Sequence, residues 1–261
     1  MTSKTLFLVH GFMGSALNWG PVITRLKANS DLSAWNFVAA DLLGHGGRRG
    51  PDALPYEVLD HAHLMADLKL QLPAGDFVAL GHSFGIRPLL SLSQDPDVGP
   101  RMKTLIIEDA SPEITQENYF RLKRIIDRVP VPFTSRDEAK EAIYAQFPND
   151  RTLAMFLFSN IRKLDSGEHS WRFDKDGLIN LLEEAHRLPL WSEWSNYSGN
   201  LIVMRGVDSD HLDQARLNRA LEARGSKSVQ LIEIAQSGHW IHSEQVEKFT
   251  EELVKILISQ T

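Results

Sequence analysis

Two residues of this chain have the types and settings that acyl transfer to a serine requires. Ser83 lies at the centre of Gly81-His-Ser-Phe-Gly85, which follows a short apolar run beginning after Asp76. The pattern predicts a strand, a sharp turn and a helix, with the serine hydroxyl exposed at the corner. A serine hydroxyl is a poor nucleophile at neutral pH unless a base removes its proton. His239, which follows the last predicted strand in Gly238-His-Trp240, is the candidate base.

The histidine base needs a carboxylate, and the chain offers three candidates. A carboxylate fixes the tautomer of the imidazole and stabilises the imidazolium that forms. Asp109 ends one apolar run, whereas Asp208 and Asp210 follow another, with Ser209 between them. Because all of these residues come directly after predicted strands, the residues alone leave the choice of acid open.

Backbone amides in two glycine-bearing loops are the candidate donors to an oxyanion. Attack on a carbonyl carbon produces an anionic tetrahedral intermediate, which hydrogen-bond donors stabilise. Phe84 directly follows Ser83, and Phe12 lies in the loop after the first predicted strand. We therefore expect the backbone N–H groups of Phe12 and Phe84 to form the oxyanion hole.

The elements that must position these residues are strands that alternate with amphipathic helices. The apolar runs predict strands at 5–9, 36–40, 76–80, 103–109, 200–204 and 228–234. Helical spacing follows at 16–28, 58–72, 86–92, 211–223 and 244–258. This alternation predicts an α/β fold with a doubly wound, mostly parallel sheet. Ligands bind outside the carboxyl ends of the strands in such sheets, so the loops that carry the candidate residues should converge there.

One long segment departs from the alternation. Between 112 and 189 four amphipathic stretches follow one another with no predicted strand between them, at 118–128, 137–147, 151–163 and 177–188. We expect a helical cap at 112–189 over the catalytic edge of a core formed by 1–111 and 190–261. Some of its aromatic side chains should line an acyl pocket.

Composition excludes several classes of function. The chain of 261 residues is 43% hydrophobic, carries a formal net charge of -6 and contains no cysteine. The acidic balance argues against a nucleic-acid ligand, and no apolar run approaches the roughly 20 residues of a membrane span. The absence of cysteine excludes disulfides and thiolate metal sites. With no signal peptide evident, a cytoplasmic monomer or homodimer is the expectation.

The remaining histidines have structural interpretations. His10 and His45 lie in loops near the predicted site, where we expect them to brace the backbone. His239 and His242 have a spacing seen in metal sites, but no neighbouring carboxylate or thiol completes a ligand set. We therefore expect no metal and no cofactor.

The motifs resemble those of the α/β-hydrolase superfamily over almost the whole chain. The matching pieces are 10–15, 41–46, 81–85 and 238–240. Asn160-Ile-Arg-Lys163 and Trp171-Arg-Phe-Asp174 resemble the cap of a small bacterial and mitochondrial esterase and thioesterase branch. Two features depart from the family pattern. The sequence begins at the strand before the loop of 10–15, so we expect the fold to lack the two antiparallel strands that usually lead it. The elbow continues as Gly85-Ile-Arg87, where many members carry a second glycine.

The resemblance also bears on the acid. Most family members place an aspartate where Ser209 stands, but the esterase branch has one in an Asp-x-x-Pro context that Asp109-Ala-Ser-Pro112 matches. This implies Asp109 as the acid, with Ser209 adding a hydrogen bond to it. In the alternative, Asp109 only caps a helical turn and Asp208 or Asp210 serves as the acid.

The predicted activity is hydrolysis of a small-molecule carboxylic ester, or a thioester, through an acyl-enzyme on Ser83. The same residues would also suit a carbon–carbon bond hydrolase, a lyase or an acyltransferase, because a fold and a triad do not fix the substrate. A ligand-binding protein that keeps the fold without turnover is the alternative of a different class.

Overall fold

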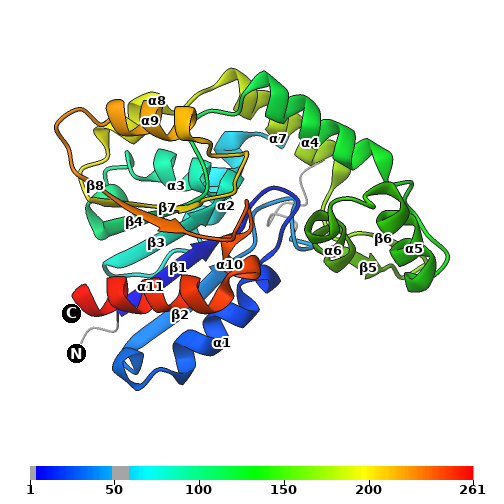
Figure 1. Ribbon diagram of the computed structural model, residues 1–261, viewed down its shortest axis with the longest axis horizontal. Helices are drawn as coiled ribbons and strands as arrows, with labels where there is room; N and C mark the ends of the chain where they lie inside the picture. Colours follow the sequence, from blue (N-terminus) through cyan, green and yellow to red (C-terminus); the bar gives the residue numbers. More distant parts are fainter. Residues whose placement is uncertain (1–3, 49–58, 261) are drawn as a thin grey trace.

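The computed structural model describes residues 4–48 and 59–260, and its centre is a parallel sheet (Figure 1). Six strands lie in the order β2-β1-β3-β4-β7-β8. Their bounds are β1 Lys4–Val9, β2 Trp35–Ala40, β3 Phe77–His82, β4 Met102–Glu108, β7 Asn200–Gly206 and β8 Val229–Ile234. Every pair of neighbours among these six strands is parallel. The predicted mostly parallel α/β sheet is therefore confirmed.

Helices cover both faces of the sheet. The bounds of those on the two faces and at the strand ends are α1 Gly20–Ala28, α2 His61–Lys69, α3 Ile86–Leu92, α8 Trp191–Asn196, α9 Gln214–Glu222, α10 Ile241–Glu244 and α11 Val246–Ser259. Short 3-10 turns add Ala16–Trp19, Ser30–Leu32, Ser83–Gly85 and Gly99–Arg101. Helix α2 begins after Asp60, whose carboxylate accepts a hydrogen bond from the backbone of His63. The start of its predicted range, Val58, lies outside the described residues.

The strand sequences explain why helices cover the sheet on both of its faces. Successive side chains of a strand point to opposite faces. In β1, Leu6 and Leu8 join the apolar cluster that contains α1 and α11 side chains, whereas Phe7 and Val9 join the cluster that contains α2 and α3 side chains. All four side chains are fully buried. A continuous apolar run is thus what a strand buried on both faces requires.

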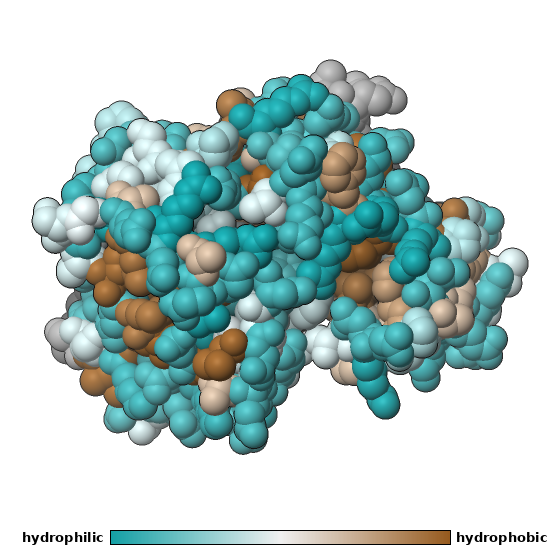
Figure 2. Space-filling view, turned by 45° about the horizontal axis from the view of Figure 1, so that its top comes forward, coloured by the Kyte–Doolittle hydropathy of each residue, from teal (hydrophilic) through white to brown (hydrophobic). Residues whose placement is uncertain are grey.

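The helical segment, defined here as α4 to α7, lies between β4 and β7 in sequence and to one side of the sheet in Figure 1. Its elements are α4 Gln116–Arg128, α5 Arg136–Gln146, α6 Arg151–Ser159, β5 Ile161–Lys163, β6 His169–Trp171 and α7 Lys175–Arg187. Figure 2 shows apolar side chains, in brown, in the recess where this smaller lobe meets the main body.

The prediction that this segment contains no strand is wrong. Strands β5 and β6 form an antiparallel hairpin, and the helix predicted at 151–163 ends at Ser159. The turn of the hairpin is closed by a hydrogen bond from the Leu164 amide to the carbonyl of Glu168 at 2.7 Å. Gly167 adopts φ of 92° there, a conformation that glycine reaches without a Cβ clash. Strands of three residues are too short to show alternation in the sequence.

The described residues contain no helix whose length and apolar character would let it cross a membrane.

Candidate active site

Ser83 lies at a strained turn at the carboxyl end of β3. Its φ is +50°, so the left-handed torsion falls on the serine itself and not on the flanking glycines. The glycines are required for close approach. A Cβ on Gly81 would lie 2.9 Å from the amide nitrogen of Ile86, and one on Gly85 would lie 2.5 Å from the carbonyl oxygen of His10. Both distances are shorter than real Cβ contacts allow, so the two glycines let strand, turn and helix pack together.

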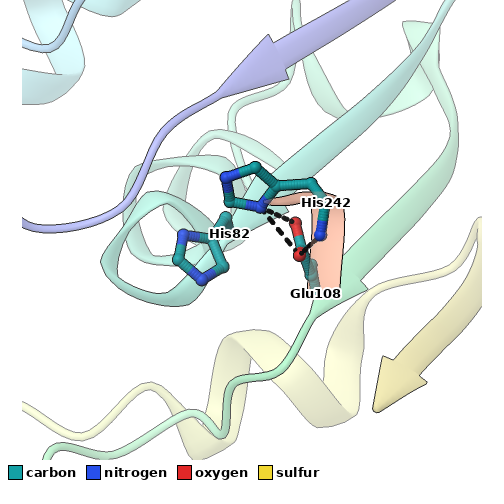
Figure 3. A group of neighbouring side chains, drawn as sticks. All are labelled: His82, Glu108 and His242. Carbon is teal, nitrogen blue, oxygen red and sulfur yellow. Dashed lines mark hydrogen bonds and ion pairs between the residues drawn. The ribbon is translucent and has the colours of Figure 1, made fainter. Parts of the chain in front are cut away.

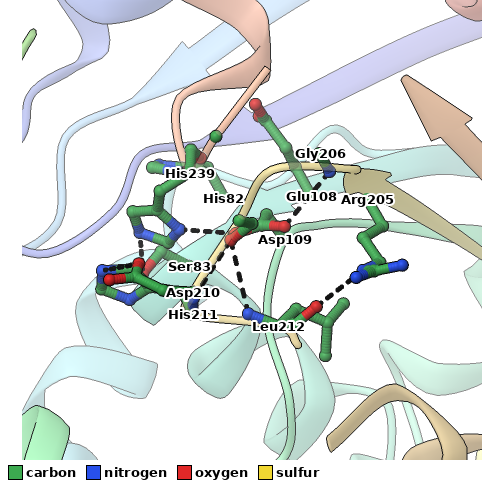
Figure 4. A network of polar contacts seen from close by, with 12 residues as sticks. His82, Ser83, Glu108, Asp109, Arg205, Gly206, Asp210, His211, Leu212 and His239 are labelled. Atoms are coloured by element: carbon green, nitrogen blue, oxygen red, sulfur yellow. Dashed lines mark hydrogen bonds and ion pairs between the residues drawn. The ribbon is translucent and has the colours of Figure 1, made fainter. Parts of the chain in front are cut away.

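A continuous chain of hydrogen bonds joins Ser83, His239 and Asp109 (Figure 4). His239 Nε2 lies 3.0 Å from Ser83 Oγ, and His239 Nδ1 lies 2.8 Å from Asp109 Oδ2. Asp109 is fully buried and His239 is 8% exposed. The three residues come from the loops after β3, β4 and β8, which meet at one edge of the sheet. This arrangement lets the imidazole accept the serine proton while the carboxylate orients it.

Further donors hold the Asp109 carboxylate. Ser209 Oγ donates to Oδ2 at 2.5 Å, and the amide of Gly206 donates to Oδ1 at 3.3 Å. Ser209 Oγ in turn accepts from the amide of His211 at 3.1 Å. The hydrogen bond expected between Ser209 and Asp109 is therefore present, and it fixes the orientation of the carboxyl group.

The two alternative aspartates do not reach the histidine. Asp208 is exposed, and its backbone amide donates to the carbonyl of Ser237. Asp210 is 70% exposed and forms an ion pair with Arg121 at 2.7 Å. Of the three candidate acids, only Asp109 lies within hydrogen-bond distance of His239.

Two pockets adjoin Ser83. The first is lined by Phe12, Ser83, Phe84, Arg87, Asp109, Ala110, Ser111, Glu113, Ile114, Asn118, Leu122 and His211. The second is lined by Phe12, Met13, His82, Ser83, Arg121, Leu122, Ile125, Leu153, Phe156, His211, His239 and Trp240. Ser83 and Phe12 thus lie where the pockets meet. The first pocket is rich in polar side chains, whereas aliphatic and aromatic side chains of α4 and α6 dominate the second.

Phe12 and Phe84 lie beside the hydroxyl of Ser83. Their ring centroids are 5.4 Å apart, and both residues line the first pocket. Phe84 follows Ser83 directly in the turn that leads into α3. This is the position from which its backbone amide would serve an oxyanion, as the sequence predicts.

His211 is a site residue that the sequence interpretation placed only at a helix start. Its ring stacks on that of His239, with centroids 3.7 Å apart and planes at 14°, and it lines both pockets. Helix α9 begins only at Gln214, after Asp213 as its N-cap, so His211 belongs to the loop after β7. Its place after a strand was the one signal that could have drawn attention to it.

A second cluster of ionisable groups is formed by His82, Glu108 and His242 (Figure 3). His82, Glu108 and His242 are buried, and their potential ligand atoms lie within 4.8 Å of one another, which makes them a group that could hold a metal ion. His242 donates from its backbone amide and Nδ1 to Glu108 Oε1, at 2.9 and 2.8 Å. His82 Nε2 contacts the carbonyl oxygen of His239 at 2.9 Å.

The same cluster also braces the site. His82 and Glu108 immediately precede Ser83 and Asp109, and the contact from His82 reaches the backbone of His239. The His82 side chain therefore contacts the backbone of a candidate triad residue, while Glu108 and His242 bond to each other. The expectation that no carboxylate lies near His242 is wrong: Glu108 does, and His82, not His239, is the second histidine of the group.

His10 and His45 brace the backbone of their loops, as expected. His10 Nε2 accepts a hydrogen bond from the amide of Leu42 at 3.1 Å. His45 Nδ1 lies 3.2 Å from the carbonyl oxygen of Leu43.

Burial shifts the ionisation of the central pair. Burial lowers the pKa of His239 to about 3, and the nearby Arg121 and His242 act in the same direction. Burial raises the pKa of Asp109 to about 7, while hydrogen bonds from Ser209 and Gly206 oppose this and favour the carboxylate. His239 is therefore neutral near pH 7, which is the form that a general base needs.

Acid should destabilise the fold through its buried histidines. Burial lowers the pKa of His10, His45, His61, His82, His211 and His239 below the ordinary 6.5, to about 4 for His61 and about 2 for His211. Between pH 6.5 and about 4 the unfolded chain therefore binds more protons than the folded one, so stability falls as the pH falls. Asp109, whose pKa is raised, offsets at most one of these protons.

We expect urea unfolding to show a free energy of unfolding several kcal/mol lower at about pH 5.5 than at about pH 7.5, since each histidine contributes up to about 1.4 kcal/mol per pH unit. In His211→Gln the free energy of unfolding should depend less steeply on pH, because the unfolded chain then binds about one extra proton fewer. Equal unfolding free energies at the two pH values would contradict the assignment of neutral buried histidines.

The fold and the position of the site define an α/β hydrolase. Residues 6–252 match the description "Alpha/beta hydrolase family", and the chain belongs to that family. Among curated relatives, the sn-1-specific diacylglycerol lipase ABHD11 of Mus musculus is 24% identical over 98% of this chain and 81% of its own length. Esterase Rv0045c of Mycobacterium tuberculosis is 24% identical over 93% of this chain and 78% of its own length.

Solved structures share the fold at lower identity. That of E-2-(acetamidomethylene)succinate hydrolase superposes with a TM-score of 0.78 at 17% identity, over 98% of this chain and 92% of that one.

Proposed function

We propose that this protein hydrolyses carboxylic esters through an acyl-enzyme, with Ser83 as nucleophile, His239 as base and Asp109 as the acid of the triad. The observation that carries the proposal is the unbroken chain of contacts from Ser83 Oγ through both ring nitrogens of His239 to Asp109 Oδ2. Ser83 lies where two pockets meet, and these pockets supply room for the acyl part and the alcohol part of an ester. The curated relatives named as a lipase and an esterase support ester cleavage.

The first half of the reaction forms the acyl-enzyme. Ser83 Oγ attacks the carbonyl carbon as its proton passes to His239 Nε2, and the carbonyl oxygen becomes an oxyanion. The backbone amides of Phe12 and Phe84 would stabilise this oxyanion, and one such donor is typically worth about 3 kcal/mol. The bond to the leaving oxygen then breaks, and His239 Nε2 returns the proton to the departing alcohol.

The second half releases the acid. Water attacks the acyl carbon and loses its proton to His239 Nε2. The tetrahedral intermediate then collapses, and the proton passes from His239 to Ser83 Oγ. Asp109 keeps Nδ1–H as a donor throughout, so the imidazole presents its unprotonated Nε2 to each nucleophile in turn. A thioester would follow the same steps with a thiol as leaving group.

The helical segment fits the role of a cap over this site, with 112–189 as cap and 1–111 with 190–261 as core. Helix α4 contributes Leu122 and Ile125 to the second pocket, and α6 contributes Leu153 and Phe156. These side chains are apolar, so the second pocket suits a modest acyl chain or an apolar alcohol.

The experiment that tests this function is hydrolysis of p-nitrophenyl esters from acetate to decanoate. We expect turnover by the wild type with an optimum at a modest chain length. Leu153→Trp should move the optimum to shorter chains because it fills the second pocket, whereas Met155→Trp, on the exposed face of the same helix, should not. Folded wild-type protein that turns over no ester would contradict the proposal, and an optimum unmoved by Leu153→Trp would contradict the assignment of the pocket.

A further inference from the structure

Arg87 is a buried cation close to the nucleophile. It lies in α3, four residues after Ser83, and is 3% exposed. Its guanidinium donates to two backbone carbonyl oxygens, that of Leu188 at 2.5 Å and, through a long contact of 3.4 Å, that of Pro112. Nε has no hydrogen-bond partner. Within residues 4–48 and 59–260 no carboxylate lies within ion-pair distance of it, so its charge is left uncompensated by contact.

Burying a cation without a counter-ion is costly, and the shift of its pKa reflects that cost. Burial lowers the pKa of Arg87 to about 10, although the more distant Glu184 and Glu193 act in the opposite direction. Glu184 accepts a hydrogen bond from the backbone amide of His61 and makes no direct contact with the guanidinium. Arg87 nevertheless stays protonated near pH 7.

The other charged groups of the first pocket have hydrogen-bond partners of their own. Glu113 accepts from Arg219 and from the indole N–H of Trp191, at 2.5 and 3.1 Å. Asp109 is held by its own donors. In the second pocket the corresponding cation, Arg121, is paired with Asp210. Arg87 therefore places a buried cation, which no carboxylate of the described residues contacts, in the first pocket beside Ser83, where Asn118 adds a polar side chain.

We propose that the first pocket binds a carboxylate of the substrate, with Arg87 as its counter-ion. The inference rests on the proposed ester hydrolysis and names its substrate class: esters that carry a negatively charged group on one side of the scissile bond and an apolar group on the other. A guanidinium makes strong, charge-assisted hydrogen bonds to carboxylates. Much of the free-energy cost of removing the Arg87 guanidinium from water already arises when the protein folds, so binding of a substrate adds little to it.

Arg87 also has a structural contact that a test must separate from binding. Its two carbonyl acceptors, in Pro112 and Leu188, lie just before α4 and just after α7, where the chain enters and leaves the helical segment. Loss of the side chain could therefore lower activity on every ester. Discrimination between an anionic ester and its neutral analogue isolates the charge, because a displaced helical segment would affect both alike.

The experiment compares kcat/KM for two matched pairs of esters. In the first pair, mono-4-nitrophenyl glutarate and methyl 4-nitrophenyl glutarate, the carboxylate lies on the acyl side. In the second pair, the butyrate esters of 4-hydroxybenzoate and of methyl 4-hydroxybenzoate, it lies on the alcohol side. We expect the wild type to prefer the anionic member of at least one pair by about tenfold or more, a difference that one charged hydrogen bond can supply.

Three variants test whether Arg87 causes the preference for the anionic ester. Arg87→Met should abolish it, and Arg87→Lys should retain part of it. Arg121→Met, which removes an equal charge from the second pocket, should leave it intact. No preference in the wild type, or an equal loss on both members in Arg87→Met, would overturn the inference and leave Arg87 as a structural contact only.

Direct binding separates this inference from the proposed function. Isothermal titration of wild-type protein with glutarate should show binding that Arg87→Met lacks and Arg87→Lys weakens. If no ester of either pair is hydrolysed, the proposed function fails while glutarate binding still decides the anion site. If Arg87→Met does not fold, the inference depends on the wild type, in which glutarate must inhibit hydrolysis of the neutral esters competitively. Absence of both binding and inhibition would overturn it.

Discussion

Ser83→Ala should abolish ester hydrolysis while leaving the fold intact. Loss of a serine nucleophile of this kind typically lowers kcat by about 10⁴-fold to 10⁶-fold. The reason is that, among residues 4–48 and 59–260, no other hydroxyl shares the contact with His239 Nε2 that Ser83 Oγ makes at 3.0 Å. Initial rates on p-nitrophenyl butyrate, with circular dichroism and thermal unfolding of both proteins, measure the effect.

Ser195→Ala is the matched control. Ser195 lies in α8 outside both pockets, and its hydroxyl donates to the carbonyl oxygen of Ala223 at 2.7 Å. We expect it to keep activity within about threefold of the wild type, as surface-type hydroxyl losses usually do. Hydrolysis that survives in Ser83→Ala would place the nucleophile elsewhere.

Asp109→Asn should be the second most damaging change. We expect kcat to fall by about 10⁴-fold, since an amide in this position favours the wrong imidazole tautomer. The conflict is specific here: Asp109 Oδ2 accepts from both His239 Nδ1 and Ser209 Oγ, and an NH₂ group at that position could accept from neither. The measurement is kcat and KM on the same ester, with thermal unfolding to show that the fold persists.

Asp208→Asn serves as the control because Asp208 is exposed and makes no side-chain contact with His239. Its activity should stay within about twofold of the wild type. The opposite pattern, with Asp109→Asn active and Asp208→Asn or Asp210→Asn inactive, would transfer the role of the acid to the loop after β7.

The sheet was predictable because burial on both faces leaves a local signature. The central strands β1, β3 and β4 contain continuous apolar runs, such as Leu6 to Val9, and such runs need no knowledge of distant contacts. The edge strand β8, which leads to His239, is only partly buried and includes Gln230 and Glu233. The hairpin of β5 and β6 lacked this signature. Ile161 continues the apolar pattern of the preceding helix, and only the pairing with Trp171 makes it a strand.

The candidate site was predictable only in part, for a related reason. Ser83 and His239 each lie in a motif directly after a strand, so local sequence identifies them. Asp109 and Asp208 both follow neighbouring strands, β4 and β7, and the choice between them depends on three-dimensional distances. The roles inferred for Arg87 and His211 depend wholly on such distances. Arg87 Nε has no hydrogen-bond partner, and His211 stacks on His239, and local sequence shows neither fact.

The most direct test of the serine mechanism is intact-mass analysis after reaction with a fluorophosphonate, followed by peptide mapping. Such reagents phosphonylate serines that an adjacent base activates. We expect one adduct per chain, located on Ser83, absent from Ser83→Ala and formed far more slowly in Asp109→Asn. An adduct on another residue, or a wild type that hydrolyses esters without being labelled, would contradict it.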